Sequence, residues 1–234
     1  LSPAYTILPP ALSMLGTEEL KKTFLPKIAA GEIDMFLGFS EPEAGSDLAN
    51  LQCKAILDGD EFVVNGQKLF SSQANNADYA WMAVRTDLNV PKHKGISLMI
   101  IDMKSPGISI DSYKTMGGWW HFGVQFENVH VPRGNLFGEL NKGWYHLMTA
   151  LDFERASNGN PGHVVRLFDD LLDYCRETLR EGSPLVEDPR VRNVLSDLAA
   201  DVRSAQLVSY WVASMHAKGM YPQHETSLAS LHMR

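Results

Sequence analysis

The sequence predicts an α+β fold, in which a central antiparallel β-barrel or sandwich domain is flanked by helical-bundle segments. Short β-prone runs, separated by turn signals, fill residues 36–142. No long helical pattern interrupts them, which is typical of antiparallel barrels and sandwiches. Residues 1–35 and 143–234 instead carry helical signals. We therefore expect three parts with these boundaries.

The bulk composition argues against several classes of protein. The chain has 234 residues, of which 44% are hydrophobic, enough for one large or two small cores. Its net charge of −7 argues against a nucleic-acid or anionic-membrane partner, and no apolar run approaches the roughly 18 residues that span a bilayer. Cys53 and Cys175 lie far apart and the histidines lack ligand spacing, which predicts reduced thiols, a cytoplasmic location and no metal.

The N-terminal part shows one well-marked helix. Thr17 is suited to cap a helix that begins at Glu18, and Gly31 is suited to end it. The helical spacing of Leu20, Phe24 and Ile28 places them on one face. Pro26 is expected to kink or divide this helix, because proline removes a backbone donor.

The central part reads as a series of strands. Asp58-Gly59 is a strong hairpin signal, and Asn65-Gly66 predicts the next turn. The polar segment 87–94 is expected to be an exposed loop. We expect strands at residues 52–57, 61–64, 67–72, 79–86, 95–102, 108–110 and 124–131.

The C-terminal part reads as three helical stretches. Residues 158–162 (Asn-Gly-Asn-Pro-Gly) interrupt the first, and residues 164–179 resume the pattern. Asp188-Pro189 is a cap and first-turn pair, and Gly219 is suited to stop the last helix. That helix carries an apolar stripe expected to be bundle core, made of Val191, Val194, Leu195, Leu198, Val202 and Ala205.

Residues 36–47 are the most informative run of the chain. An apolar stretch suited to a buried strand ends at Ser40, and Gly45 is expected to allow a turn where a Cβ would clash. Ser40, Ser46 and nearby amides are able to bind a polar ligand. A second hydroxyl pair, Ser71-Ser72, follows another strand-like run. The two clusters are therefore suited to hold the two ends of a flat cofactor, although ordinary strand-end hydroxyls are the alternative.

Several ordered motifs resemble the flavin-dependent acyl-CoA dehydrogenases. The resemblance runs from about Gly16 to the last residue and is strongest in the centre. It implies a fragment that covers the end of an N-terminal helical domain (1–35), the middle β domain (36–142) and the start of a C-terminal helical domain (143–234). The motifs that carry it are Ser40–Asp47, Asn65–Lys68, Ala77–Tyr79, Val84–Asp87, Phe126–Pro132 and Gly143-Trp144.

The resemblance implies an FAD site. Ser40 and Ser72 match positions that hydrogen-bond the edge of the isoalloxazine ring, and Phe70 matches an aromatic residue packed on that ring. Ser46 matches a contact to the cofactor pyrophosphate or to the thioester. The implied cofactor set is Phe39, Ser40, Gly45, Ser46, Phe70, Ser71, Ser72 and Arg180, the last across a subunit interface.

The resemblance also implies a reaction, the α,β-dehydrogenation of an acyl-CoA thioester in fatty acid or lipid catabolism. Glu154 matches one of two places from which the family draws its base. The other place lies beyond this fragment, and a solvated, locally paired helix residue is the alternative for Glu154. Asp152 and Arg155 match positions near the CoA, although an exposed helix Asp is an equal alternative for Asp152. With Ser46 they are the candidate substrate-binding residues.

The implied partners are the acyl-CoA substrate, electron-transfer flavoprotein or a similar acceptor, and further subunits in a homo- or hetero-oligomer. Oxygen as the acceptor is a related alternative. A second hypothesis is a catalytically silent or flavin-poor scaffold subunit of a heteromeric dehydrogenase. The interruption at residues 158–162 suggests a pocket reshaped for a bulky acyl group. Glu41 and Asp47 are acidic, and we expect them to bond the turn rather than to contact a phosphate.

Overall fold

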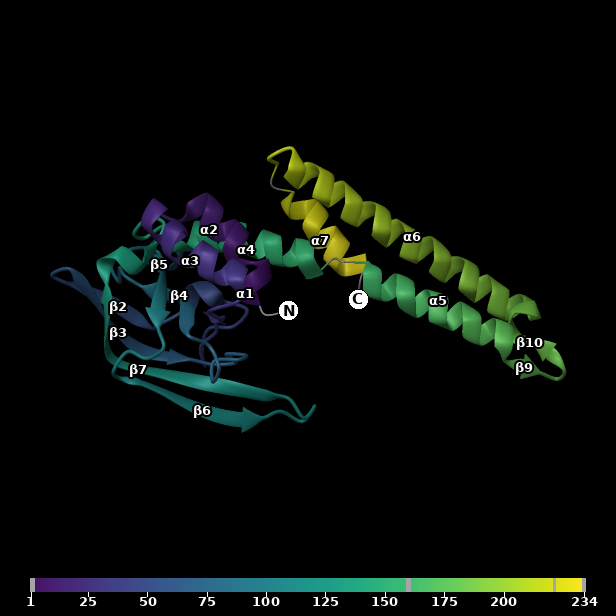
Figure 1. The fold of residues 1–234 in the computed structure, drawn as a ribbon, viewed down its shortest axis with the longest axis horizontal. Helices are drawn as coiled ribbons and strands as arrows, with labels where there is room; N and C mark the ends of the chain where they lie inside the picture. The colour runs from purple at the N-terminus through teal and green to yellow at the C-terminus, as the bar shows by residue number, and fades with distance from the viewer. Residues whose placement is uncertain (1–2, 159–160, 221, 233–234) are drawn as a thin grey trace. The chain divides into compact units, whose positions relative to one another are not determined.

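The structure is a computed structural model that describes residues 3–158, 161–220 and 222–232. These residues belong to two compact units, Leu1–Leu151 and Asp152–Arg234. The first unit contains the N-terminal helices and the main sheet, and the second contains the long helices α5 and α6 (Figure 1).

The first unit begins with α1 (Pro3–Thr6), α2 (Leu8–Leu15) and α3 (Glu18–Ala30). Thr17 Oγ1 accepts a hydrogen bond from the Leu20 amide, and Gly31 adopts the left-handed conformation that closes α3, so both predicted ends are confirmed. Pro26 lies inside α3, so it does not divide the helix, and a kink at Pro26 stays a prediction. Residues on both sides of Pro26 are buried in the core, and this packing offsets the roughly 3 kcal/mol that an internal proline costs.

The main sheet is mixed and open. Its strand order is β6-β7-β3-β2-β4-β5-β8, and β1 pairs with β4 off this path. The α+β class is confirmed, but β4 pairs in parallel with both β1 and β2, so the sheet is not purely antiparallel and forms no closed barrel within the described residues. The strands are β1 (Met35–Gly38), β2 (Lys54–Asp58), β3 (Glu61–Lys68), β4 (Tyr79–Arg85), β5 (Ile96–Asp102), β6 (Ile108–Lys114), β7 (Trp120–Pro132) and β8 (Leu136–Phe137).

A hydrophobic core lies on each face of this sheet. The α1–α3 helices and the first turns of α4 cover one face, where Trp81 and Leu98 pack. Met82 and Met99 pack on the other face with residues of β2, β3 and β7. The central strands β4 and β5 are therefore buried on both sides, which explains their almost continuous apolar sequence. The long strands β6 and β7 extend side by side as a ribbon (Figure 1).

The hairpin between β2 and β3 forms as predicted, with Asp58 paired to Glu61 around Gly59. The second predicted turn, at Asn65-Gly66, is wrong. β3 continues through it, and the pairing of β3 with β7 shifts register between Val64 and Gly66, which is a β-bulge. Gly66 has a φ of +147°, and a Cβ there would lie 2.6 Å from Cys53 Cα. Glycine is thus required for close approach of β2 rather than for a turn.

The Gly66→Ala substitution is expected to lower the free energy of unfolding by about 2–4 kcal/mol. The new methyl group would collide with the backbone of Cys53, and the φ of Gly66 favours glycine. Chemical denaturation of the full-length protein measures this loss. Gly134→Ala is the matched control, since a Cβ at Gly134 meets nothing within 4 Å. Equal stability of the two variants would contradict the role given to Gly66.

The short 3₁₀ segments of the chain are η1 (Leu48–Asn50), η2 (Lys92–Lys94), η3 (Arg133–Asn135) and η4 (Leu185–Glu187). The segment η2 occupies part of the predicted loop at residues 87–94, whose side chains are mostly exposed. No helix in the described ranges is both long and apolar enough to cross a membrane.

The second unit contains the end of α4, a helical hairpin and a final helix. Asp188 accepts a hydrogen bond from the Arg190 amide, which confirms the predicted cap of α6. α5 and α6 lie side by side, with the β9–β10 hairpin at one end (Figure 1). The elements are α4 (Gly143–Asn158), α5 (Gly162–Glu177), β9 (Leu179–Arg180), β10 (Ser183–Pro184), α6 (Pro189–Ala217) and α7 (Gln223–His232).

The ends of α4 and α5 agree with the predicted break between the helices. α4 ends at Asn158 and α5 begins at Gly162, while residues 159–160 lie outside the described residues. The apolar stripe of α6 is only partly buried, because Leu195 is covered whereas Val194 is 58% exposed. The predicted domain bounds stay a prediction, since α4 begins at Gly143 while the two units meet inside this helix.

Candidate functional site

The two predicted hydroxyl clusters lie at neighbouring chain segments. The Leu69 amide donates a hydrogen bond of 2.9 Å to the Ser40 carbonyl, and the Ser71 amide donates one of 2.9 Å to the Phe122 carbonyl. The end of β1 therefore lies against the segment that follows β3. These strands do not pair in the sheet, so sequence order alone does not bring Ser40 close to Ser72.

Phe70 presents an aromatic ring beside these segments. Its side chain is 58% exposed, and its backbone φ is +56°, an uncommon value for a residue with a bulky side chain. The Phe70 amide donates to the Tyr113 hydroxyl at 3.1 Å. The Phe70 ring also meets the rings of Tyr113 and His121 edge to face, at centroid distances of 6.1 and 6.3 Å. The β6–β7 ribbon thus supports this aromatic ring in a strained conformation of the kind found at functional sites.

Ser71 and Ser72 present their hydroxyls differently. Ser72 is exposed, and its Oγ lies 3.3 Å from His121 Nδ1, with the donor set by the histidine tautomer. Ser71 is buried, and its Oγ has no hydrogen-bond partner within the described residues. A buried hydroxyl without a partner is rare, and it leaves hydrogen-bonding capacity that this chain does not use. Tyr113 and His121 were not found from the sequence, because their role depends on the pairing of β6 with β7.

The turn that carries Gly45 and Ser46 is open to solvent. Backbone hydrogen bonds of 2.9 and 3.1 Å between Glu41 and Ala44 close it. A Cβ at Gly45 would meet nothing within 4 Å, so the expectation that Gly45 avoids a clash with this chain is wrong. The turn is closed before Gly45 is reached, and Gly45 and Ser46 are both exposed. The open space leaves room for a ligand beside the Ser46 hydroxyl.

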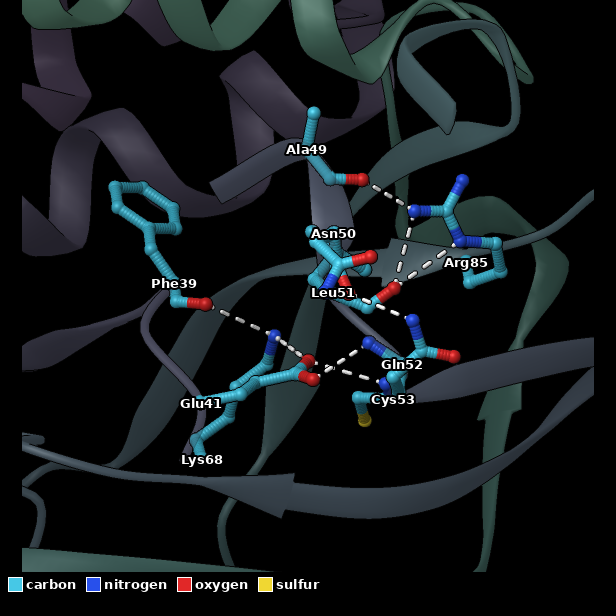
Figure 2. A network of polar contacts seen from close by, with 9 residues as sticks. All are labelled: Phe39, Glu41, Ala49, Asn50, Leu51, Gln52, Cys53, Lys68 and Arg85. Carbon is cyan, nitrogen blue, oxygen red and sulfur yellow. Dashed lines mark hydrogen bonds and ion pairs between the residues drawn. The ribbon is translucent and has the colours of Figure 1, made fainter. Parts of the chain in front are cut away.

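A buried ion pair lies directly beneath the two segments (Figure 2). Lys68 Nζ donates to Glu41 Oε1 at 2.7 Å and to the Phe39 carbonyl at 3.2 Å. The side chains of Lys68 and Glu41 are 0% and 5% exposed. The other contacts of the Glu41 carboxylate are to backbone amides, those of Gln52 at 2.5 Å and Cys53 at 3.0 Å. The Glu41 carboxylate was expected to bond the turn, but it binds Lys68 and the residues that enter β2, and only the Glu41 backbone closes the turn. The burial of Lys68 was not foreseen.

Asp47 also has a structural partner, but this partner is Lys92 and not the turn that was expected from the sequence. Its carboxylate pairs with Lys92 Nζ at 2.6 Å on the surface. Arg85 is a second buried cation, and its guanidinium donates to the carbonyls of Ala49 and Leu51 (Figure 2). It also donates to the Lys92 carbonyl. Burial lowers the pKa of Arg85 from its ordinary value, and it raises the pKa of the Cys53 thiol to about 11. Cys53 is therefore an unreactive thiol at neutral pH.

The predicted substrate residues lie on the last turns of α4, in the second unit. Arg155 Nη1 donates to the buried Asp152 Oδ1 at 2.6 Å. Glu154 lies between them in the sequence and is half-buried. The roles of Glu154, Asp152 and Arg155 stay predictions.

The two remaining predicted cofactor residues have structural surroundings of their own. Phe39 packs edge to face on Trp81, with ring centroids 5.5 Å apart. Arg180 is exposed on β9 and lines a hollow of about 350 Å³ together with Asp188 and Arg190. The cofactor contacts of Phe39 and Arg180 stay predictions. No three His, Cys, Asp or Glu side chains lie together as metal ligands in the part of the chain that the structure describes.

The site in the first unit has the features of a surface for a flat, polar-edged ring. Phe70 supplies an exposed aromatic face, Ser72 an exposed hydroxyl, Ser71 an unsatisfied hydroxyl and Gly45 an open approach. The isoalloxazine ring of FAD needs such hydrogen bonds at its edge and such packing on its face. The residues present therefore fit a flavin.

Comparison with known proteins identifies the family. The models "Acyl-CoA dehydrogenase, middle domain" and "Acyl-CoA dehydrogenase, C-terminal domain" match residues 37–129 and 141–232. The chain belongs to the acyl-CoA dehydrogenase family, flavoprotein oxidoreductases that act on CH–CH bonds. It is 40% identical over 206 residues to the acyl-CoA dehydrogenase FadE29 of Mycobacterium tuberculosis (strain ATCC 25618 / H37Rv), with 88% of this chain and 53% of that protein covered.

Solved structures agree with this assignment. The Tcur3481-Tcur3483 steroid ACAD G363A variant matches with a TM-score of 0.90 and 35% identity, covering 98% of this chain and 60% of that chain. The ChsE4-ChsE5 complex from Mycobacterium tuberculosis matches with a TM-score of 0.86 and 34% identity, covering 97% and 59%. The chain thus spans about half the length of FadE29 and 60% of the first of these structures.

Proposed function

We propose that the full-length protein catalyses the FAD-dependent α,β-dehydrogenation of an acyl-CoA thioester. The observation that carries the proposal is the contact between Ser40 and Leu69, which gathers a hydroxyl, an exposed Phe70 ring and Ser72 at one place. In a chain of this family, such a cluster is suited to the flavin. Bound FAD supplies the acceptor for the hydride that leaves the β carbon.

Different residues of this chain would bind different parts of FAD and of the substrate. Ser40 and Ser72 hydrogen-bond the edge of the ring, and Phe70 packs on its face. Gly45 and Ser46 leave room for a phosphate or thioester and offer a hydroxyl to it. Supporting roles in the same cofactor site are proposed for Phe39, Ser71 and Arg180.

The proposed general base for removal of the α proton lies on α4. Glu154 takes the α proton as a general base, which requires that the thioester oxygen accept hydrogen bonds to make that proton acidic. The Asp152–Arg155 pair, with one member buried, braces the same helical turn. A locked turn keeps the Glu154 carboxylate at a defined angle to the helix, which is what proton abstraction needs.

Two further features of the proposal concern partners and substrate. A hetero-oligomer is supported by similarity to a two-component complex. A bulky, ring-containing acyl group is supported by similarity to a steroid ACAD and by the end of α4 at Asn158 and the start of α5 at Gly162. An electron-transfer flavoprotein or a similar acceptor is proposed as the oxidant, and a cytoplasmic location is also proposed. The second candidate function is a flavin-poor scaffold subunit, which the same two-component similarity favours.

The test is the colour of the purified full-length protein and its response to substrates. We expect yellow absorbance, release of FAD on denaturation, and bleaching of the flavin by at least one thioester from an acyl-CoA panel. Ser72→Ala is expected to weaken FAD binding about fivefold, the worth of one hydrogen bond near 1 kcal/mol. Ser109→Ala, at an exposed serine of β6, is the control. A colourless protein that gains no colour with added FAD would favour the scaffold.

A further inference from the structure

We infer that the buried Glu41–Lys68 ion pair is a positioning device for the flavin site, which sets the spacing between the end of β1 and the segment after β3. The inference rests on the proposed function, because it assigns the pair a role toward FAD. Neither residue touches the exposed surface, so the pair acts through its neighbours Ser40 and Leu69.

The topology of the sheet creates the need for such a device. β1 pairs with β4, whereas β3 pairs with β2 and β7. The ends of β1 and β3 are therefore not held together by strand pairing. Yet the proposed flavin residues are divided between these two ends, Ser40 at one and Phe70 and Ser72 at the other. A cofactor held from both sides needs their spacing to be defined by something other than the sheet.

Three contacts supply that connection within the described residues. The Leu69 amide donates to the Ser40 carbonyl at 2.9 Å, and Lys68 Nζ donates to the Phe39 carbonyl at 3.2 Å. Lys68 Nζ also donates to Glu41 Oε1 at 2.7 Å. Glu41 directly follows Ser40 and Lys68 directly precedes Leu69, so each member of the ion pair lies one residue from the contact that the pair reinforces.

The carboxylate of Glu41 adds a third segment to the connection. Both of its oxygens accept from the backbone that enters β2, at Gln52 and Cys53. Lys68, Glu41 and the β2 entrance therefore form one hydrogen-bonded unit around a buried ion pair. Charge-assisted hydrogen bonds of this kind are directional, and they define geometry more narrowly than apolar packing does.

Stability alone does not account for the pair. Replacement of a buried ion pair by apolar groups of similar volume is often neutral or stabilising, because desolvation of the charges opposes their attraction. Such a replacement would, however, remove the hydrogen bonds that fix the spacing between the end of β1 and the segment after β3. The positioning role therefore predicts that replacement of the ion pair changes FAD affinity and the flavin spectrum even where the protein still folds.

The decisive variant is the double replacement Glu41→Gln/Lys68→Met in the full-length protein, which removes both charges together. We expect a folded protein that binds FAD at least tenfold more weakly and shows a shifted flavin absorption band and reduction potential. The single variant Lys68→Arg keeps the charge and the hydrogen-bond donors. It is expected to have an FAD affinity and a flavin spectrum between those of the wild type and the double variant. FAD titration and redox titration measure these effects.

Arg85→Met is the matched control. Arg85 is also a buried cation that holds backbone carbonyls, but its contacts are at residues 49, 51 and 92 rather than at the ends of β1 and β3. It should lower the melting temperature and leave the flavin spectrum and potential of the folded protein unchanged. Equal spectral shifts in Arg85→Met and in the double variant would overturn the positioning role, because both would then reflect general loosening.

Further outcomes separate this inference from the proposed function. A wild-type protein that binds FAD, together with a double variant of unchanged affinity, spectrum and potential, overturns the inference and leaves the function standing. A wild-type protein that does not bind FAD overturns both. Should the double variant fail to fold, Glu41→Asp is measured instead, because it keeps the charge and withdraws the carboxylate by one methylene. An unshifted spectrum in Glu41→Asp would then overturn the inference.

Discussion

Replacement of Lys68 alone by methionine is expected to lower the free energy of unfolding by about 3–5 kcal/mol. Lys68 is fully buried, and its ammonium group neutralises a Glu41 side chain that is 5% exposed. Methionine fills a similar volume but leaves that carboxylate in the interior without its counter-ion. Since folded proteins have only about 5–15 kcal/mol of stability, the loss should be visible as a large decrease in the denaturant midpoint.

The surface pair of Lys92 and Asp47 provides the control for Lys68→Met. Its partners are about half exposed and 2.6 Å apart, so Lys92→Met should cost at most about 1 kcal/mol. The two variants make the same chemical change at a buried and at an exposed lysine. If Lys68→Met were no less stable than Lys92→Met, the buried pair would not hold the first unit together. Recovery of stability in Glu41→Gln/Lys68→Met would show that the unpaired carboxylate causes the loss.

Replacement of Glu154 by glutamine is expected to slow reduction of the flavin by an acyl-CoA thioester about 10²–10⁴-fold, the usual contribution of a general base. The amide keeps the size of the side chain but does not accept the α proton. Substrate binding should change little, because the amide retains its hydrogen-bonding capacity. Stopped-flow absorbance under single-turnover conditions measures the rate of reduction directly.

Glu177→Gln, at the end of α5, is the control for Glu154→Gln. It makes the same substitution at an exposed helical glutamate of the second unit to which no role is assigned. Both variants should retain FAD, so that a slower reduction reports the proton step and not loss of the cofactor. A normal rate in Glu154→Gln would place the base elsewhere in the full-length protein.

The sequence by itself determined those features that depend on a few adjacent residues. The capped start of α3 at Thr17, its end at Gly31 and the hairpin at Asp58-Gly59 form where they were predicted. Each is decided by backbone conformation and hydrogen bonding within one turn, so the local residues suffice. The ordered motifs also indicated the family, because they combine several such local requirements in one order.

Tertiary structure alone decided the features that depend on distant partners. Asn65-Gly66 has the signal of a turn, but β3 continues through it with a register shift against β7, and Gly66 lies close against Cys53. Pro26 stays inside α3 because buried residues hold the helix on both sides.

The candidate site itself combines the two kinds of information. Ser40, Phe70 and Ser72 were named from motifs, but their proximity follows from the hydrogen bond between Leu69 and Ser40. The burial of Lys68 had no local signal, since an isolated lysine is strongly solvated and is almost never buried without a partner. The partner, Glu41, is distant in sequence, and only folding brings the two charges within 2.7 Å. Local sequence thus determines which groups are available, and long-range packing determines which of them meet.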